Sequence, residues 1–130
     1  MKVVIDCNVI VSAALAGGTC REVVAKAIRY HEIILSDPIV DEYMAISRRP
    51  KHAHYRDHLL NLVNQIHKAA IVVEPENVTF GLRDPDDEVY LATAVTGGAA
   101  VITGNTKDFT KPKYGPVDIL SPRMFLDQIE

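Results

Sequence analysis

Short apolar runs alternate with longer amphipathic stretches along the chain. In residues 21–30 the apolar positions share one helical face, and residues 55–70 repeat that spacing. The apolar runs are short and rich in β-branched residues, which is typical of buried strands. Five strands are predicted, at residues 2–5, 33–35, 71–73, 100–103 and 117–120. This alternation predicts an α/β domain with a parallel central sheet.

Three further helix starts are marked by an Asp or Ser followed by proline, at Asp37, Asp84 and Ser121. The Asp or Ser side chain can cap the first-turn amides, and proline is tolerated at the next position because its N–H would have no partner there. Gly97 and Gly98 predict the end of the helix that begins at Asp84, since glycine readily adopts the left-handed C-cap conformation. Residues 74–83 are the longest predicted loop.

The composition adds limits on size and partners. The chain has 130 residues, 48% of them hydrophobic and 24% charged, as expected of one globular domain. A net charge of -3 and a pI of about 5.9 exclude nucleic-acid binding through bulk positive charge, so a polyanion must be bound locally. Cys7 and Cys20 fit neither a disulfide scaffold nor a zinc spacing, and we expect reduced thiols. Residues 9–16 are too short an apolar stretch to cross a membrane and no signal peptide is visible, so we expect a cytoplasmic protein without membrane association.

Four acidic residues are predicted to meet at the carboxyl edge of the sheet, where ligands bind in open parallel sheets. Asp6 directly follows the first strand, and Asp108 follows the fourth. Glu42 lies early in the helix that follows the second strand. Asp87 lies in the first turn of the helix predicted from Asp84 to about Val95, whose length of roughly 18 Å matches the roughly 17 Å of the strand after it. If the two pack antiparallel, Asp87 returns to the same edge.

Four converging carboxylates repel one another unless a cation lies among them, and Mg²⁺ or Mn²⁺ is suited to an all-oxygen site. Such an ion can activate water and bind phosphate oxygens together. The polar side chains expected to support the carboxylates are Asn8, Ser12, Thr103 and Asn105. Asp84 and Asp37 have a simpler interpretation as helix caps, and Asp87 is favourable in any first helical turn. Asp6 is the strongest candidate, because a carboxylate at the end of a buried strand needs a partner.

Four segments of the chain resemble the PIN domain, the nuclease fold found in toxin components of many toxin-antitoxin pairs. The segments are VVIDCNVIVSAA, DPIVDEYMAI, DPDDEVYLATA and VITGNTKDF, in the order of the family. The resemblance covers residues 1–130 as a single PIN domain. It implies a Rossmann-like, three-layer α/β/α arrangement around a parallel sheet of about five short strands.

The resemblance assigns the family's four acids to Asp6, Glu42, Asp87 and Asp108, with Asn8 and Asn105 in supporting positions. Asp84, Asp86 and Asp87 all stay open as the third acid. The resemblance further implies Mg²⁺- or Mn²⁺-dependent endoribonuclease activity that leaves 5′-phosphate and 3′-hydroxyl ends. It also implies a homodimer and an antitoxin protein as partner.

Two basic segments are the candidate RNA contacts, because cations near the site supply most of the sequence-independent affinity for phosphates. The candidate residues are Arg48, Arg49, Lys51, Arg56, Lys107 and Lys111. Tyr55 and Tyr114 could stack on unpaired bases or pack in the protein.

Two alternatives to a nuclease remain. A phosphatase of the haloacid-dehalogenase kind also places an Asp after the first strand, but that chemistry needs a second Asp two residues later, and Asn8 stands there. A catalytically silent RNA- or protein-binding module on the same fold is disfavoured by the intact set of four acids.

Overall fold

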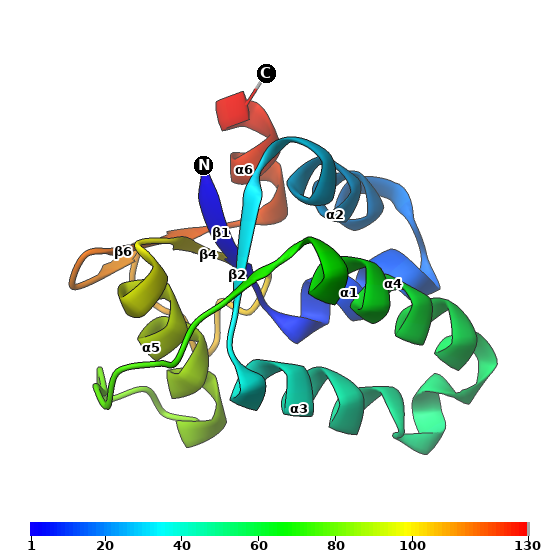
Figure 1. Cartoon of the computed structure of the whole chain (residues 1–130), viewed down its shortest axis with the longest axis horizontal. Coiled ribbons are helices and arrows are strands. Elements are labelled where there is room, and N and C mark those ends of the chain that lie inside the picture. The colour runs from blue at the N-terminus through cyan, green and yellow to red at the C-terminus, as the bar shows by residue number, and fades with distance from the viewer. Residues whose placement is uncertain (130) are drawn as a thin grey trace.

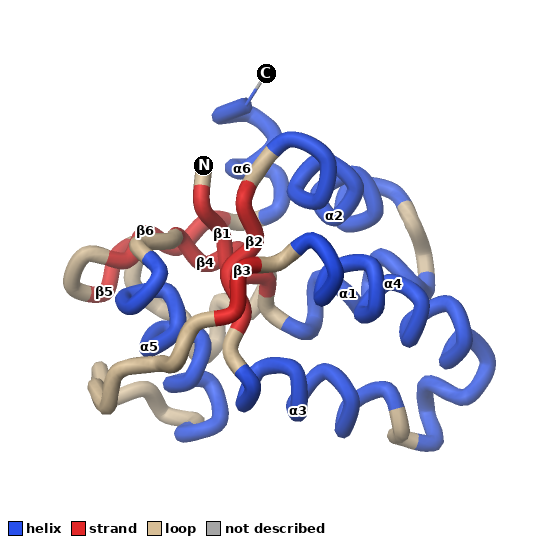
Figure 2. The backbone as a smooth tube through the Cα atoms, in the orientation of Figure 1, coloured by secondary structure: helices blue, strands red, loops and turns tan. Residues whose placement is uncertain are grey.

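A six-stranded sheet forms the centre of the computed structural model, which describes residues 1–129. The strand order is β3-β2-β1-β4-β6-β5, and all neighbours are parallel except β5, which is antiparallel to β6 (Figure 2). The strands are β1 (Lys2–Ile5), β2 (Glu32–Leu35), β3 (Ile71–Val72), β4 (Ala100–Ile102), β5 (Lys113–Tyr114) and β6 (Val117–Leu120). The five predicted strands are confirmed, and β5 is a sixth, two-residue strand that the sequence does not predict.

Helices cover both faces of this sheet (Figure 1). Helix α5 packs on one face against β1, β2 and β4, whereas α1, α2 and α4 pack together on the other. The α-helices are α1 (Cys7–Leu15), α2 (Gly18–Tyr30), α3 (Asp37–Ser47), α4 (Arg56–Ala69), α5 (Glu88–Gly97) and α6 (Pro122–Ile129). Two 3₁₀ helices, η1 (Pro50–Tyr55) and η2 (Pro85–Asp87), precede α4 and α5. The three-layer α/β/α arrangement is confirmed, and the predicted apolar faces of α2 and α4 are buried.

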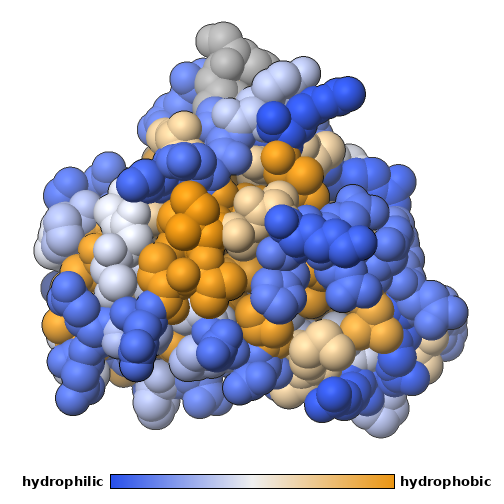
Figure 3. Space-filling view, viewed as in Figure 1, coloured by the Kyte–Doolittle hydropathy of each residue, from blue (hydrophilic) through white to orange (hydrophobic). Residues whose placement is uncertain are grey.

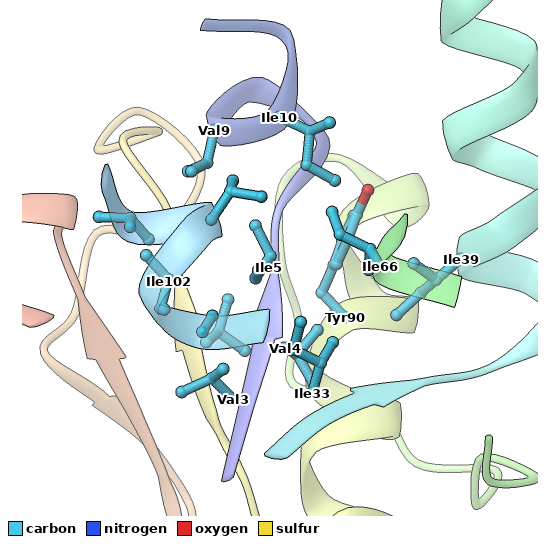
Figure 4. Close-up of a cluster of buried hydrophobic side chains, with 14 of the residues drawn as sticks. Val3, Val4, Ile5, Val9, Ile10, Ile33, Ile39, Ile66, Tyr90 and Ile102 are labelled. Carbon is cyan, nitrogen blue, oxygen red and sulfur yellow. The ribbon is translucent and has the colours of Figure 1, made fainter. Parts of the chain in front are cut away.

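Strand β1 lies in the middle of the sheet and is covered on both faces. Val3, Val4 and Ile5 are fully buried, and successive side chains of a strand point to opposite faces. Figure 4 shows apolar side chains packed around this strand, including Val9, Ile10, Ile39, Ile66 and Tyr90. Asp6, the next residue, is therefore placed where a completely buried strand ends.

Helix α1 follows β1 directly, and Asp6 occupies its N-cap position. The sequence gives no clear helical period here, because nearly every residue from Val9 to Leu15 is apolar. Val9, Ile10, Ala13 and Ala14 are buried. Within residues 1–129 no single helix is long and apolar enough to cross a membrane, although α1 and α2 together pass that test by length and composition across a bend of 117°.

Two of the three predicted helix caps are confirmed and one is wrong. Asp84 accepts a hydrogen bond from the Asp86 amide, and Ser121 accepts one from the Met124 amide, each at 3.0 Å. Asp37 is not a cap: it is the first residue of α3, and Ser36 occupies the N-cap position. Ser36 is fully buried, and its hydroxyl pairs with that of Thr93 on α5 at 2.8 Å.

Helix α5 packs closely against β2 at its last residue, Gly97. A Cβ atom there would lie 2.5 Å from Cγ2 of Ile34, so the contact requires glycine. Gly98 then ends the helix in the left-handed conformation, with φ of 64°, as the sequence predicts.

Strand β3 forms an exposed apolar edge of the sheet. Ile71 and Val72 are 46% and 49% exposed, and β3 pairs only with β2. Figure 3 shows apolar side chains gathered near the middle of this face of the molecule, where β2 and β3 lie in Figure 2.

Candidate metal centre at the carboxyl edge

Asp6 is fixed at the carboxyl edge by the neighbouring strand β4. Its amide donates to the Ile102 carbonyl at 3.0 Å, and its Oδ2 accepts from Thr103 Oγ1 at 2.6 Å. Only 1% of Asp6 is exposed. Burial raises the pKa of Asp6, and the Thr103 hydrogen bond partly opposes that shift. The end of β4 thus holds the carboxylate that follows β1.

The turn after β4 positions Asp108 through Asn105. The Asn105 amide group donates to Asp108 Oδ2 at 2.9 Å, and its carbonyl oxygen accepts from the Asp108 amide at 3.2 Å. Asn105 is itself tied to Thr103, because its backbone amide donates to Thr103 Oγ1 at 2.9 Å. Hydrogen bonds from Asn105, and then the Arg83 guanidinium 3.1 Å away, lower the pKa of Asp108. Thr103 and Asn105 therefore link Asp6 to Asp108.

Asp84, Asp87 and Asp108 form the tightest carboxylate cluster. One oxygen of each lies within 4.8 Å of the others. Asp84 is the N-cap of the 3₁₀ helix η2 and Asp87 is its last residue, and side chains three residues apart are eclipsed in that geometry. The sequence predicts an α-helix from Asp84. The tighter 3₁₀ turn explains why the Asp84 carboxylate lies beside that of Asp87 while it also caps the turn.

Asp87 carries the most strongly perturbed carboxyl of this cluster. Burial, followed by the charges of Asp6, Asp84 and Asp108, raises its pKa to about 7. Its Oδ2 is buried and has no hydrogen-bond partner among the described residues. Asp87 therefore combines an unpartnered carboxylate oxygen with close acidic neighbours, an arrangement that a cation would stabilise.

Glu42 reaches the same edge from α3, where it is half-buried. Its Oε1 accepts from the Cys7 thiol at 3.8 Å. Burial and the charges of Asp86 and Asp6 raise its pKa. Asp6 raises the pKa of both Glu42 and Asp87, and the charge of Asp108 also raises that of Asp87. The four predicted acids therefore form one linked group, with Asp84 and Asp86 as additional members.

Glu88 has a different role from the other acids near η2. Its two carboxylate oxygens accept hydrogen bonds from the Phe80 and Leu82 amides, each at 2.7 Å. Gly81 between them has φ of 73°, which suits glycine. Glu88 thus anchors the loop that leads into Arg83 and Asp84. From the sequence, Glu88 is only an acidic residue in the first turn of a helix that follows a loop glycine, so this role is not predicted.

Two buried tyrosines beneath the site are not predicted by the sequence. Tyr43 donates to the Ile5 carbonyl, and the Tyr90 hydroxyl accepts from the Cys7 amide at 3.4 Å. Burial raises the pKa of both. They tie α3 and α5 to the end of β1.

Asn8 and Ser12 occupy a neighbouring position on α1. Asn8 accepts a weak hydrogen bond from the Cys7 thiol at 3.9 Å. Both residues line a small pocket that also contains Cys20 and Gly104. Within residues 1–129 neither side chain is hydrogen-bonded to the carboxylates, in contrast to Thr103 and Asn105.

The basic residues predicted to contact RNA lie in two separate parts of the structure, one at the end of α3 and one beside Asp108. Arg48, Arg49 and Lys51 are exposed beyond the end of α3, which runs away from α5 in Figure 1. The Arg56 guanidinium donates to the Ser47 carbonyl at 2.7 Å, and to those of Arg48 and Arg49 at 3.3 and 3.2 Å. Arg56 therefore caps α3.

Lys107 and Lys111 are exposed beside Asp108. The two tyrosines near the basic segments contact the protein itself. Tyr114 is buried, and Tyr55 is hydrogen-bonded to His52.

The parallel sheet and the carboxylates at its edge define an α/β protein with a candidate divalent-cation site. The family model for the PIN domain matches residues 2–107, so the chain belongs to the PIN domain family. No curated protein matches the chain.

The fold is shared with solved toxin-antitoxin structures. VapBC2 from Rickettsia felis, bound to a DNA fragment from its promoter, matches with a TM-score of 0.65 and 12% identity over 93% of this chain and 98% of that one. VapBC-1 from nontypeable Haemophilus influenzae matches with a TM-score of 0.63 and 12% identity over 95% and 99% of the two chains.

Proposed function

We propose that the chain is an endoribonuclease that uses Mg²⁺ or Mn²⁺ to hydrolyse RNA phosphodiester bonds. The observation that carries this proposal is the buried, unpartnered Oδ2 of Asp87 beside Asp84 and Asp108. Its donor set is all oxygen, which suits a hard divalent cation. Membership of the PIN domain family supports the same chemistry.

The residues proposed to hold the ion are Asp6, Glu42, Asp87 and Asp108, and Asp84 is added because it lies in the tightest cluster. A bound divalent cation would supply an activated water and stabilise negative charge on the phosphate. Thr103 and Asn105 act by holding Asp6 and Asp108 in place. Asp87 keeps its proton more readily than an ordinary carboxyl, so binding the ion would displace that proton at neutral pH.

The biological role proposed is that of a toxin controlled by an antitoxin protein in the cytoplasm. The fold shared with the two VapBC structures supports this role. The exposed apolar edge at Ile71 and Val72 supports a protein contact, either with an antitoxin or within a homodimer.

Cleavage of RNA with and without the ion tests the proposed activity. The purified chain is incubated with structured and single-stranded RNAs in Mg²⁺ or Mn²⁺, with a chelator as control, beside Asp6→Asn and Asp87→Asn. Cleavage that needs the ion and is lost in both variants supports the proposal. Cleavage that survives the chelator and both substitutions comes from a contaminant, and the absence of any cleavage that depends on the ion and on Asp6 and Asp87 would overturn the proposal.

The two alternatives predict different results in the same assay. A silent RNA- or protein-binding module would bind RNA without cutting any of these substrates. A phosphatase would release phosphate from small monoesters, although Asn8 stands where its general acid is needed.

A further inference from the structure

A pocket of about 270 Å³ opens beside Asp108. It lies between the loop before η2 and the loop after β4. Its walls include Phe80, Leu82, Arg83, Lys107, Lys111 and Tyr114. The notable feature is its charge, because three basic side chains face one small space next to a group of acids.

The three cations are available to a ligand. The Arg83 side chain is 75% exposed, and among the described residues it forms an ion pair only with Asp108, which leaves further N–H donors of its guanidinium. Within residues 1–129, Lys107 and Lys111 form no ion pair. Lys111 Nζ lies 5.9 Å from the centre of the Tyr114 ring. Asp108 is the only acid lining this pocket among the described residues.

The loops that carry these cations are held by hydrogen bonds. Glu88 holds the Phe80 and Leu82 amides on one side of the pocket. The Tyr114 hydroxyl accepts from the Thr110 and Lys111 amides on the other, at 3.0 and 3.2 Å. The Phe80 and Tyr114 rings meet edge to face with centres 6.3 Å apart, which joins the two loops. The pocket is therefore fixed by the fold.

We propose that this pocket binds a phosphate group of a nucleic-acid strand, held by Arg83, Lys107 and Lys111. Guanidinium and ammonium groups are the side chains that bind phosphate oxygens most strongly. Because Asp108 borders both the pocket and the carboxylate cluster, a phosphate bound here lies next to the scissile one along the strand. The proposal rests on the proposed nuclease function and adds a specific subsite to it.

Metal-free binding measurements test the pocket without relying on cleavage. Amide resonances are followed by NMR in a chelator while inorganic phosphate, adenosine 5′-monophosphate or adenosine is added. We expect the amides of Gly81, Arg83 and Lys111 to shift with the two phosphates and to stay unchanged with adenosine. Unchanged pocket amides with both phosphates would overturn the proposal.

Binding of a fluorescent single-stranded RNA over a range of salt concentrations gives the second readout. The triple variant Arg83→Gln, Lys107→Gln and Lys111→Gln should bind about tenfold more weakly at low salt, with a salt slope reduced by about two. The matched control is the triple variant Lys2→Gln, Arg29→Gln and Lys68→Gln, which removes one exposed cation each from β1, α2 and α4. Equal weakening in the control and the pocket variant would show that only overall charge matters, and would overturn the subsite.

The two proposals fail separately. If the native chain cleaves RNA but the triple variant binds RNA normally, the pocket is wrong and the nuclease stands. If the pocket binds the phosphates but no RNA is cleaved, the nuclease function is wrong and the subsite stands.

Discussion

Thr103 Oγ1 donates a 2.6 Å hydrogen bond to Asp6 Oδ2, and joins the ends of β4 and β1. The contact spans 97 positions in the sequence, yet both residues follow adjacent parallel strands. The same hydroxyl accepts from the Asn105 amide. One threonine thus connects the most buried carboxylate of the site to the turn that carries Asp108.

Removing this hydroxyl should destabilise the fold, because Asp6 would lose a partner inside the protein. We expect Thr103→Val to lower the free energy of unfolding by about 1–3 kcal/mol. The hydrogen bond also opposes the burial that raises the pKa of Asp6, so Asp6 should be harder to ionise in the variant. Urea denaturation at neutral pH measures the loss. Thr103→Ser keeps the hydroxyl and should recover most of it, whereas equal loss in both variants would point to packing alone.

Asp87 should make the metal-free protein less stable as the pH rises. Its pKa is 3.8 in the unfolded chain and about 7 in the folded one, so between these values the folded state holds the extra proton. Stability from this group is present at low pH and is lost as the pH rises through about 7. Asp87→Asn should therefore stabilise the chelator-treated protein at pH 8 by on the order of 2 kcal/mol, with a smaller gain near pH 4.

Thermal unfolding at both pH values measures this difference. Added Mg²⁺ or Mn²⁺ should raise the melting temperature of the native chain at pH 8 and have a smaller effect on Asp87→Asn, because a bound ion stabilises the state that holds it. A variant that is equally destabilised at both pH values would contradict the electrostatic interpretation.

Strand topology explains why part of the site could be predicted from the sequence. Asp6 and Asp108 follow strands that the apolar pattern identifies, and parallel strands bring their carboxyl ends to one edge. The position of Asp87 can be predicted from the length of its helix, since a helix packed antiparallel to the next strand begins at that edge. These arguments need only the order and direction of the elements.

The remaining features depend on local geometry that the pattern does not encode. Helix α1 is apolar on nearly every side and shows no period. The 3₁₀ turn at η2, which places Asp84 beside Asp87, looks like an ordinary helix start in the sequence. The contacts of Glu88 depend on the path of a loop, and Arg56 looks like any exposed cation until its carbonyl partners are seen.

Glu88 should control the order of the loop that leads into the site. Glu88→Ala removes both acceptors from the Phe80 and Leu82 amides, so these amides should exchange with solvent faster while those of the central strands change little. Hydrogen exchange followed by NMR measures this directly. Glu88→Gln retains one acceptor and should give an intermediate rate. Protection that survives in Glu88→Ala would show that the loop is held by other contacts.

Arg56 should contribute to stability through the end of α3. Its guanidinium donates to the Ser47, Arg48 and Arg49 carbonyls, at the end of α3 where backbone carbonyls run out of intrahelical N–H partners. The Arg49 carbonyl also accepts from the His52 amide. We expect Arg56→Met to lower the free energy of unfolding by about 1–3 kcal/mol. Arg56→Lys should recover only part of the loss, because a single ammonium group cannot reproduce the contacts that the planar guanidinium makes with three carbonyls. Urea denaturation of the three proteins tests this order, and full recovery by lysine would contradict it.

The neighbouring cations Arg48, Arg49 and Lys51 are exposed, and their replacement should give the opposite pattern. We expect the triple alanine variant to unfold at the same urea concentration as the native chain but to bind single-stranded RNA more weakly, with a smaller salt slope. Arg56→Met supplies the comparison, since it should lose stability with less change in that slope. Fluorescence anisotropy from low to physiological salt measures the RNA affinity of both variants and its dependence on salt. Unchanged RNA binding in the triple variant would remove this segment from the RNA surface and leave the cations beside Asp108 as the remaining candidates.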